Sequence, residues 1–355
     1  MAKKFCQLYL PALYESHDDG TLNEITGHIL QSVKNAGFDG VYLIGLWRDG
    51  GYDNGFDIIE YEVNPKFGTL FDFRILLILA HHLGLKVGVD VVPNHTSNQS
   101  LLAQNCLNGI PGYEDVLYVI SEAEAKRLTK AGVPSFFGKL AYSDFDDKYV
   151  RSTFADYHQL NLNWHSQKVK EYFKEVFEQL KRSGIDFVRV DCGMMLLEDV
   201  SKADPTNPMA CFNPQASIEA IREIAGDMPL FFEWFDLTSV DLFNGLDNCW
   251  ALDCSYVLTG KVNTDWHHEK LIPLLGGHDQ MTLADRGLDV PEVMAKAIKS
   301  KYVFSDMQTE LGWTTEAEIL PGDEKNDADL KNPNQRYRAR RPLAPIVEAF
   351  IEKYR

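Results

Sequence analysis

Short apolar segments with strand character alternate along this chain with longer segments of helical character. Eight strand candidates follow one another: Phe5–Leu10, Phe38–Leu46, Leu85–Val92, Ile185–Val190, Pro229–Phe232, Cys249–Cys254, Lys270–Leu275 and Lys301–Ser305. Helical patterns separate them, among them Thr21–Asn35, Phe71–Leu83, Val169–Arg182, Ala216–Ile224 and Pro291–Ile298. Gly37, Gly84 and Gly184 follow three of these patterns and predict where the helices end. Apolar strands that alternate with helices form parallel sheets, and eight such units predict an α/β fold closed into a (β/α)8 TIM barrel.

The alternation stops between Asn94 and about Asn163. Proline, glycine, asparagine and aromatic residues are scattered there, and only Ser121–Ala131 has a helical pattern. We interpret residues 94–163 as a short subdomain inserted after the third strand. The barrel is then predicted to comprise residues 1–93 and 164–355. A length of 355 residues suits a barrel of about 250 residues with insertions better than two unrelated domains.

The acidic balance of the chain excludes several classes of partner. It has 35 Lys and Arg against 52 Asp and Glu, a formal net charge of −17. Such a surface repels the phosphates of nucleic acids and of anionic lipids, so we expect neither nucleic acid nor a membrane as a partner. No apolar stretch approaches the roughly 18 residues of a membrane span, and the N-terminus lacks the apolar core of a signal peptide.

The six cysteines are distributed without a recognisable pattern. They form no Cys-x-x-Cys pair and no regular framework, and no histidine stands beside one of them at metal-ligand spacing. We expect free thiols, no metal centre and a reducing, cytoplasmic location. The sequence offers no basis for predicting an oligomeric state.

Charged side chains gather where the predicted strands end. In a barrel of this type the carboxyl ends of all strands meet at one rim, which is where catalytic groups lie. Four strand ends contribute such residues: Asp90 lies near the end of the third strand and is followed by Asn94 and His95, Arg189 and Asp191 end the fourth, Glu233 ends the fifth, and His278 and Asp279 follow the seventh. Any one of them alone is more often a helix cap or an ion-pair partner. Their convergence on one rim predicts a catalytic site.

Two of these carboxyl groups suit the cleavage of a glycosidic bond. A retaining glycosidase needs a nucleophile and a proton donor about 5–5.5 Å apart. Arg189 shares a strand face with Asp191 and is expected to keep it ionised, whereas the apolar neighbours of Glu233 are expected to keep it protonated. Asp279 is predicted to stabilise the positive charge that develops on the sugar.

At these positions the chain resembles the α-amylase family, family 13 of the glycoside hydrolases. The similar segments, in the order of the family's motifs, are Tyr52–Asp57, Asp90–His95, Leu160–Trp164, Val188–Asp191, Phe232–Trp234 and His278–Asp279. The resemblance implies that Asp191 is the nucleophile, Glu233 the general acid/base and Asp279 the stabiliser of the transition state. It further implies that His95, Arg189 and His278 bind the sugar.

Several positions depart from the family pattern. Phe56 stands where a tyrosine usually stacks on the sugar, Asn161 replaces an aspartate, and Gly277 replaces an asparagine. Asp53 resembles the aspartate with which exo-acting relatives, such as oligo-1,6-glucosidases and trehalose synthases, close a pocket around a terminal glucose. The chain stops soon after its eighth helix, so we expect no C-terminal β-sandwich.

The acidic segment 15–23 is similar to a calcium-binding loop of some relatives. Its register of oxygen ligands is imperfect, however. Calcium there is therefore left open, and no cofactor is expected to be required.

The sequence thus predicts a retaining α-glycosidase that acts on small α-linked disaccharides or oligosaccharides. A transglycosylase or isomerase of the trehalose synthase or amylosucrase type remains an alternative, because it would use the same catalytic residues. A carbohydrate-binding barrel with weak or no turnover is a second alternative.

Overall fold

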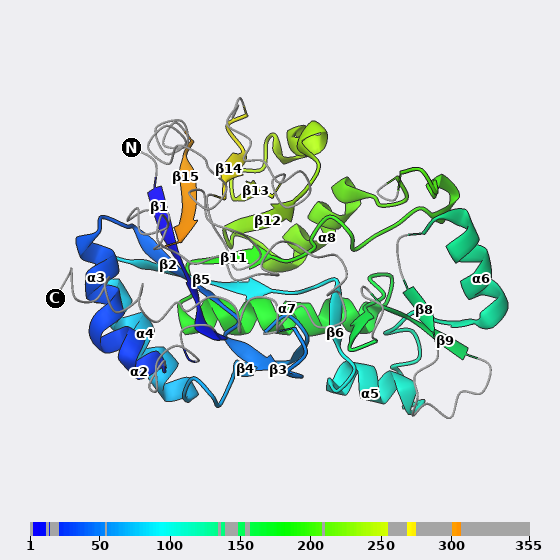
Figure 1. The fold of residues 1–355 in the computed structure, drawn as a ribbon, viewed down its shortest axis with the longest axis horizontal. Helices are drawn as coiled ribbons and strands as arrows, with labels where there is room; N and C mark the ends of the chain where they lie inside the picture. The colour runs from blue at the N-terminus through cyan, green and yellow to red at the C-terminus, as the bar shows by residue number, and fades with distance from the viewer. Residues whose placement is uncertain are drawn as a thin grey trace, which may run out of the picture.

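The computed structural model describes residues 3–11, 14, 21–53, 55–133, 136–138, 148–152, 157–207, 210–254, 268–274 and 300–306. All eight predicted strands lie in one sheet (Figure 1). They are β1 (Lys3–Tyr9), β2 (Gly40–Ile44), β5 (Lys86–Val91), β11 (Phe187–Val190), β12 (Leu230–Trp234), β13 (Cys249–Asp253), β14 (Leu271–Pro273) and β15 (Tyr302–Asp306). Their order is β14-β13-β12-β11-β5-β2-β1-β15, and every neighbouring pair is parallel. A parallel bridge between Leu274 and Phe304 joins the two outermost strands. The sheet is therefore a (β/α)8 barrel, as predicted.

Four of the predicted helices are found close to their predicted positions, whereas the predicted helix Pro291–Ile298 lies outside the described residues. They are α2 (Leu22–Glu24), the π-helical turn η1 (Ile25–Ile29), α3 (Leu30–Asn35), α4 (Leu70–His82), α7 (Gln167–Ser183) and α8 (Pro214–Ala225), with 3-10 turns η2 (Val200–Lys202) and η3 (Leu237–Phe243) after β11 and β12. A capping box of Thr69 and Asp72 starts α4. Gly184 ends α7 with a φ of 88° and donates its N–H to the Leu180 carbonyl, a conformation that glycine adopts without strain.

Aromatic side chains fill the part of the barrel interior that lies beneath the carboxyl ends of the strands. Phe5, Phe187 and Phe231 come from three strands, and their ring centroids lie 4.6 to 6.1 Å apart. Gly88 on β5 makes room for this cluster, because a β-carbon there would lie 2.0 Å from the Phe187 ring. Phe187, Arg189 and Asp191 share one face by the two-residue period of a strand. The aromatic layer thus forms the floor beneath the charged rim.

The predicted insertion, residues 94–163, contains more regular structure than we expected. Its sheet has the order β6 (His95–Ser97), β10 (Gln159–Asn161), β9 (Lys148–Ser152) and β7 (Val119–Ser121), with β8 (Phe136–Gly138) also paired to β9. Two helices accompany it, α5 (Leu101–Leu107) and α6 (Glu122–Ala131), of which α6 was predicted. Strands of three to five residues are too short to show a periodic pattern. Whether these residues form a domain of their own stays a prediction.

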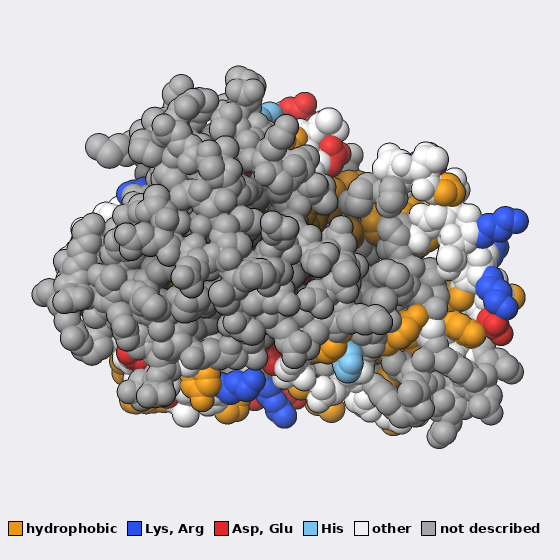
Figure 2. Space-filling model, viewed as in Figure 1, with side chains coloured by type: hydrophobic (Ala, Val, Ile, Leu, Met, Phe, Trp, Pro, Cys, Tyr) orange, Lys and Arg blue, Asp and Glu red, His pale blue; other side chains and the backbone are white. Residues whose placement is uncertain are grey.

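Helix α6 lies at one end of the molecule and is exposed there. In Figure 1, α6, β8 and β9 lie at the end of the molecule away from β1 and β15. Figure 2 shows basic side chains at that same edge, and α6 carries the exposed ion pairs Lys126–Glu122 and Arg127–Glu124. A hairpin of β3 (Trp47–Asp49) and β4 (Ile58–Val63) extends from β2. Among the described helices, none combines the length and apolar character needed to cross a bilayer.

Candidate active site

Arg189 stands at the centre of the rim and contacts three carboxylates. Its Nη1 lies 2.9 Å from Asp90 Oδ1 and 2.8 Å from Asp191 Oδ1, and its Nη2 lies 2.8 Å from Glu233 Oε1. The carboxylates come from β5, from the end of β11 and from β12, which are neighbours in the sheet. All four side chains are buried. The structure therefore brings Arg189, Asp191 and Glu233 together as the sequence predicted.

The strand register sets how Asp191 and Glu233 face each other. Val190 pairs with Phe232 across β11 and β12, so the next position along the register places Asp191 opposite Glu233. Neighbouring strands lie about 4.8 Å apart. The side chains of Asp191 and Glu233 therefore start from adjacent strands, and both reach the guanidinium of Arg189.

The electrostatics of this cluster favour a permanently charged guanidinium. Burial acts to lower the pKa of Arg189, but the attraction of Glu233, Tyr42, Asp191 and Asp90 outweighs it and the pKa is raised well above its usual value. Tyr42 on β2 donates its hydroxyl to Asp90. Chiefly because of burial, the pKa of Tyr42 is raised as well, so it remains a hydrogen-bond donor. Three carboxyl groups thus share one guanidinium in this cluster.

Glu233 has more polar neighbours than its sequence context indicated. We expected Phe231, Phe232 and Trp234 to surround it, yet its Oε1 contacts Arg189 and its Oε2 accepts the backbone N–H of Cys192 at 2.8 Å. The reason is strand alternation: Phe232 and Trp234 belong to the opposite face of β12. Each carboxylate oxygen of Glu233 thus has a polar partner.

His95 and Phe56 border the charged cluster. The His95 Nε2 donates to the Phe56 carbonyl at 3.1 Å, and both residues are buried. The Phe56 ring centroid lies 5.6 Å from Cζ of Arg189, a cation–π contact that needs no tyrosine hydroxyl. Asn161 on β10 pairs with His95 on β6, and its amide donates to Asn94 Oδ1 at 3.1 Å. The inserted sheet thus holds the histidine next to the barrel.

Asp53 lies in a loop whose backbone N–H groups are bound by the buried carboxylate of Asp57. Asp53 accepts a hydrogen bond from Gln159 of β10, and the neighbouring Tyr52 ring stacks on His158 with centroids 4.1 Å apart. Asp57 is only 1% exposed and accepts the backbone N–H groups of Tyr52 and Asp53 at 3.1 and 3.0 Å. Burial raises the pKa of Asp57 to about 7.

Some predicted residues lie outside the described part of the chain. His278 and Asp279, together with Gly277, belong to this group, and so do residues 15–20 of the segment considered for calcium. Their predicted roles stay predictions.

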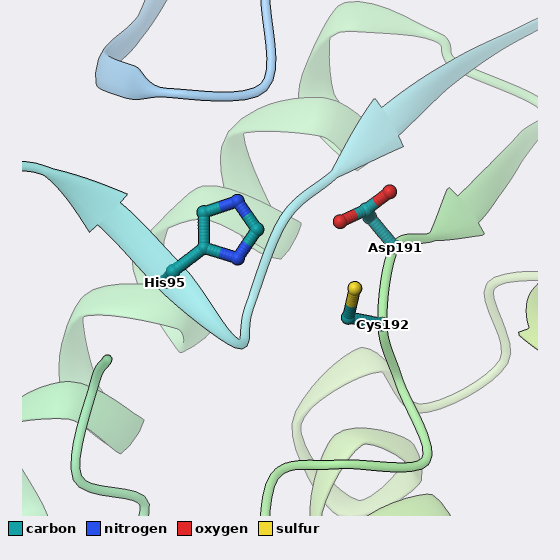
Figure 3. A group of neighbouring side chains, drawn as sticks. All are labelled: His95, Asp191 and Cys192. Carbon is teal, nitrogen blue, oxygen red and sulfur yellow. The ribbon is translucent and has the colours of Figure 1, made fainter. Parts of the chain in front are cut away.

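Two residues of the cluster, Tyr42 and Cys192, were absent from the sequence-based set. Asp90 was predicted to lie at the rim, but only the fold shows that it pairs with Arg189 across the β5–β11 register. Tyr42 gave no signal beyond its place in a buried strand. Cys192 forms a group with His95 and Asp191 whose ligand atoms all lie within 4.8 Å of one another, an arrangement that could hold a metal ion (Figure 3). All six cysteines are free, as expected.

The fold and the rim together define a (β/α)8 barrel with paired carboxylates at the ends of neighbouring strands. A family model described as the alpha amylase catalytic domain matches residues 9–234, more than half of the chain. The protein therefore belongs to the α-amylase family.

Individual relatives are more distant. The chain is 26% identical to "Maltase A1" of Drosophila melanogaster over 261 residues, covering 68% of this chain and 44% of the relative. It is 30% identical to "Oligo-1,6-glucosidase" of Parageobacillus thermoglucosidasius over 194 residues, which is 52% of this chain and 33% of the relative. The chain thus spans less than half the length of these curated relatives.

A solved structure has a similar fold. The alpha-glucosyl transfer enzyme XgtA superposes with a TM-score of 0.74 at 20% identity, covering 95% of this chain and 74% of that one.

Proposed function

We propose that this chain is the catalytic part of a retaining α-glycoside hydrolase that acts on small α-glucosides. The observation that carries the proposal is the register of β11 and β12, which sets Asp191 opposite Glu233 with Arg189 between them. The names of the matched relatives, maltase and oligo-1,6-glucosidase, support a small glucoside as the substrate.

The first step forms a covalent intermediate. A carboxylate oxygen of Asp191 attacks the anomeric carbon while the glycosidic C–O bond breaks, and Glu233 gives its proton to the departing oxygen. Arg189 donates a hydrogen bond to Asp191 Oδ1 at 2.8 Å and orients the carboxylate for this attack. As Asp191 loses its charge to the new bond, the guanidinium remains paired with Asp90.

The second step releases the sugar with its original configuration. Glu233, now a carboxylate, takes a proton from water, whose oxygen attacks the anomeric carbon and displaces Asp191. Carboxyl groups carry out both steps, and we propose that no cofactor is required.

We assign the sugar-binding contacts to residues around this pair. His95 and Arg189 border the reacting carbon, the Phe56 ring provides an apolar face, and Asp53 is held at the edge by Gln159. Asp279 and His278 complete the set in our proposal, with Asp279 stabilising the oxocarbenium charge.

Transfer of the glucosyl group to another sugar is the second candidate. The fold likeness to an α-glucosyl transfer enzyme makes it relevant, and the first chemical step is common to both reactions. The two differ only in whether water or a sugar hydroxyl accepts the glucosyl group. A binding protein without turnover is less well supported, because Arg189 holds both proposed reacting carboxyl groups, Asp191 and Glu233, at one buried position.

The stereochemistry of the product tests the proposal directly. With an aryl α-glucoside, proton NMR at early times is expected to show α-glucose before mutarotation. Initial β-glucose would contradict a retaining mechanism, and the absence of turnover across several α-sugars and pH values would favour binding alone. Chromatography after incubation with maltose separates the two enzymatic candidates, since new disaccharides without net glucose release indicate transfer.

A further inference from the structure

A thiol faces the proposed catalytic centre but has no part in the proposed reaction. Cys192 directly follows Asp191, and a ligand atom of each lies within 4.8 Å of the other and of a His95 ring nitrogen. In Figure 3 the sulfur of Cys192 and the carboxylate of Asp191 project from the end of β11 toward the space beside the imidazole, which comes from β6. His95 and Asp191 are buried and Cys192 is partly buried.

The backbone explains why two successive side chains share this space. In a regular strand, neighbouring side chains point to opposite faces. Cys192 instead has a φ of 47°, in the left-handed region that residues other than glycine seldom adopt. The turn at Cys192 breaks the alternation and brings its thiol to the side on which Asp191 lies. The surrounding chain maintains this conformation, since the Cys192 N–H is bonded to Glu233.

Imidazole nitrogen, thiolate sulfur and carboxylate oxygen are the donor types that zinc prefers. In a tetrahedral zinc site with bonds of about 2.0–2.3 Å, the ligand atoms are separated by roughly 3.5 Å. These three atoms lie within 4.8 Å of one another, so they would have to approach by at most about 1.3 Å. The charge favours a cation, because the carboxylates of Asp90 and Asp191 outnumber the single positive charge of Arg189 even when Glu233 is protonated. Asp191 has a second carboxylate oxygen besides the one that contacts Arg189.

We propose that His95, Asp191 and Cys192 form an inhibitory site for a thiophilic divalent cation of the zinc type. On binding, a metal–sulfur bond replaces the S–H bond of Cys192 and the proton leaves to the solvent, without oxidation or reduction. The inhibitory consequence rests on the proposed function, because the metal would occupy the proposed nucleophile. Binding of the metal does not depend on that function and can be measured separately.

Cobalt(II) added to the full chain reports thiolate ligation directly. We expect a sulfur-to-cobalt charge-transfer band that saturates at one ion per chain and is displaced by Zn²⁺. Absence of this band in the wild-type protein would overturn the proposal, whether or not any variant folds.

Matched cysteine variants locate the ligand. Cys192→Ser is expected to abolish the band and to weaken Zn²⁺ binding, measured by calorimetry, at least 10-fold. Cys249→Ser is the control, because Cys249 is also buried but begins β13 at the opposite end of the barrel. Loss of the band in the control, or its retention in Cys192→Ser, would contradict the assignment. Should Cys192→Ser fail to fold, Cys192→Ala replaces it in the same comparison.

Inhibition of glucoside cleavage is the second readout. Zn²⁺ is expected to compete with substrate in the wild-type protein, and its inhibition constant, measured against each variant's own activity, should rise at least 10-fold in Cys192→Ser. Non-competitive inhibition, or equal constants in both proteins, would overturn the inhibitory role. A protein that binds cobalt through Cys192 but cleaves no glucoside would refute the proposed function and leave the metal site standing.

Discussion

Strands β5 and β11 carry an ion pair at each end, and the two pairs have opposite surroundings. At the amino ends, Lys86 Nζ lies 2.7 Å from Asp186 Oδ1, with side chains 50% and 17% exposed. At the carboxyl ends, Arg189 Nη1 lies 2.9 Å from Asp90 Oδ1, with side chains 4% and 2% exposed. The distances are nearly equal, so burial is what distinguishes the pairs.

Burial changes what each pair contributes. An exposed pair gains little, because water solvates both charges well and salt screens them. In a buried pair, each charge is compensated by the other instead of by water. Removing one partner leaves the other charge uncompensated in a medium of low dielectric constant and lowers the free energy of unfolding. The rim is therefore a preorganised electrostatic site that costs stability when it is disturbed, whereas the amino ends hold a replaceable surface contact.

The largest effect is expected from Arg189→Met. It leaves Asp90, Asp191 and Glu233 buried together without a cation. Urea denaturation at neutral pH should show a loss of about 3–5 kcal/mol in the free energy of unfolding. Arg189→Lys restores the charge without the two-nitrogen fork and should recover part of the loss. A loss below about 1 kcal/mol for Arg189→Met would show that burial does not distinguish the two ends.

A second buried ion pair tests whether removing one partner is as costly away from the rim. Arg151 on β9 contacts Glu198 at 2.6 Å, with side chains 6% and 10% exposed, and its guanidinium lies over the Tyr118 ring. Arg151→Met is expected to cost about 3 kcal/mol in urea denaturation. Adding Glu198→Gln should recover more than half of that loss, because no unpaired charge then remains. If the losses of the two single variants simply added up in the double variant, an unpaired buried charge would not explain the loss in Arg151→Met.

Asp57 provides a buried charge whose effect depends on pH. Its pKa is raised from 3.8 to about 7, so between these values the folded protein holds a proton that the unfolded chain has lost. Stability contributed by Asp57 therefore falls as pH rises from about 4 to 7 and is level above 7. The stability of Asp57→Asn relative to wild type should rise by about 3 kcal/mol between pH 5 and pH 8. A difference independent of pH would show that Asp57 titrates normally in the folded protein.

The smallest effect is expected from Lys86→Met at the amino ends. Asp186 keeps a bond from the Val87 N–H and a contact with His81, so the loss should stay below about 1 kcal/mol and shrink further at high salt. Activity is expected to be unchanged, since Lys86 lies at the other end of β5 from the rim. A loss as large as that of Arg189→Met would remove the distinction between the two ends.

Local sequence was sufficient to predict the barrel and the two carboxyl groups, Asp191 and Glu233, that meet at its rim. Strands such as β5 are apolar runs bounded by glycine and proline, and the helices end at glycines with positive φ, so periodicity alone located them. Once the strands are placed, Asp191 and Glu233 must meet at one rim, because all parallel strands present their carboxyl ends on the same side.

The remaining features depend on contacts between distant segments. Cys192 and His95 are far apart in the sequence, so spacing gave no sign of their group. The polar contacts of Glu233 could not be predicted either, since its sequence neighbours lie on the opposite strand face and its actual partners are Arg189 and the Cys192 N–H. The small sheet around β9 was missed because its strands are too short for a periodic signal.

The central claim is that Asp191 and Glu233 flank one anomeric carbon, the first as nucleophile and the second as proton donor. Azide rescue of truncated variants with an activated aryl α-glucoside tests it most directly. Asp191→Gly should yield β-glucosyl azide, because azide then enters from the face of the missing nucleophile, and Glu233→Ala should yield α-glucosyl azide from the covalent intermediate. The same anomer from both variants, or rescue of neither, would contradict the account.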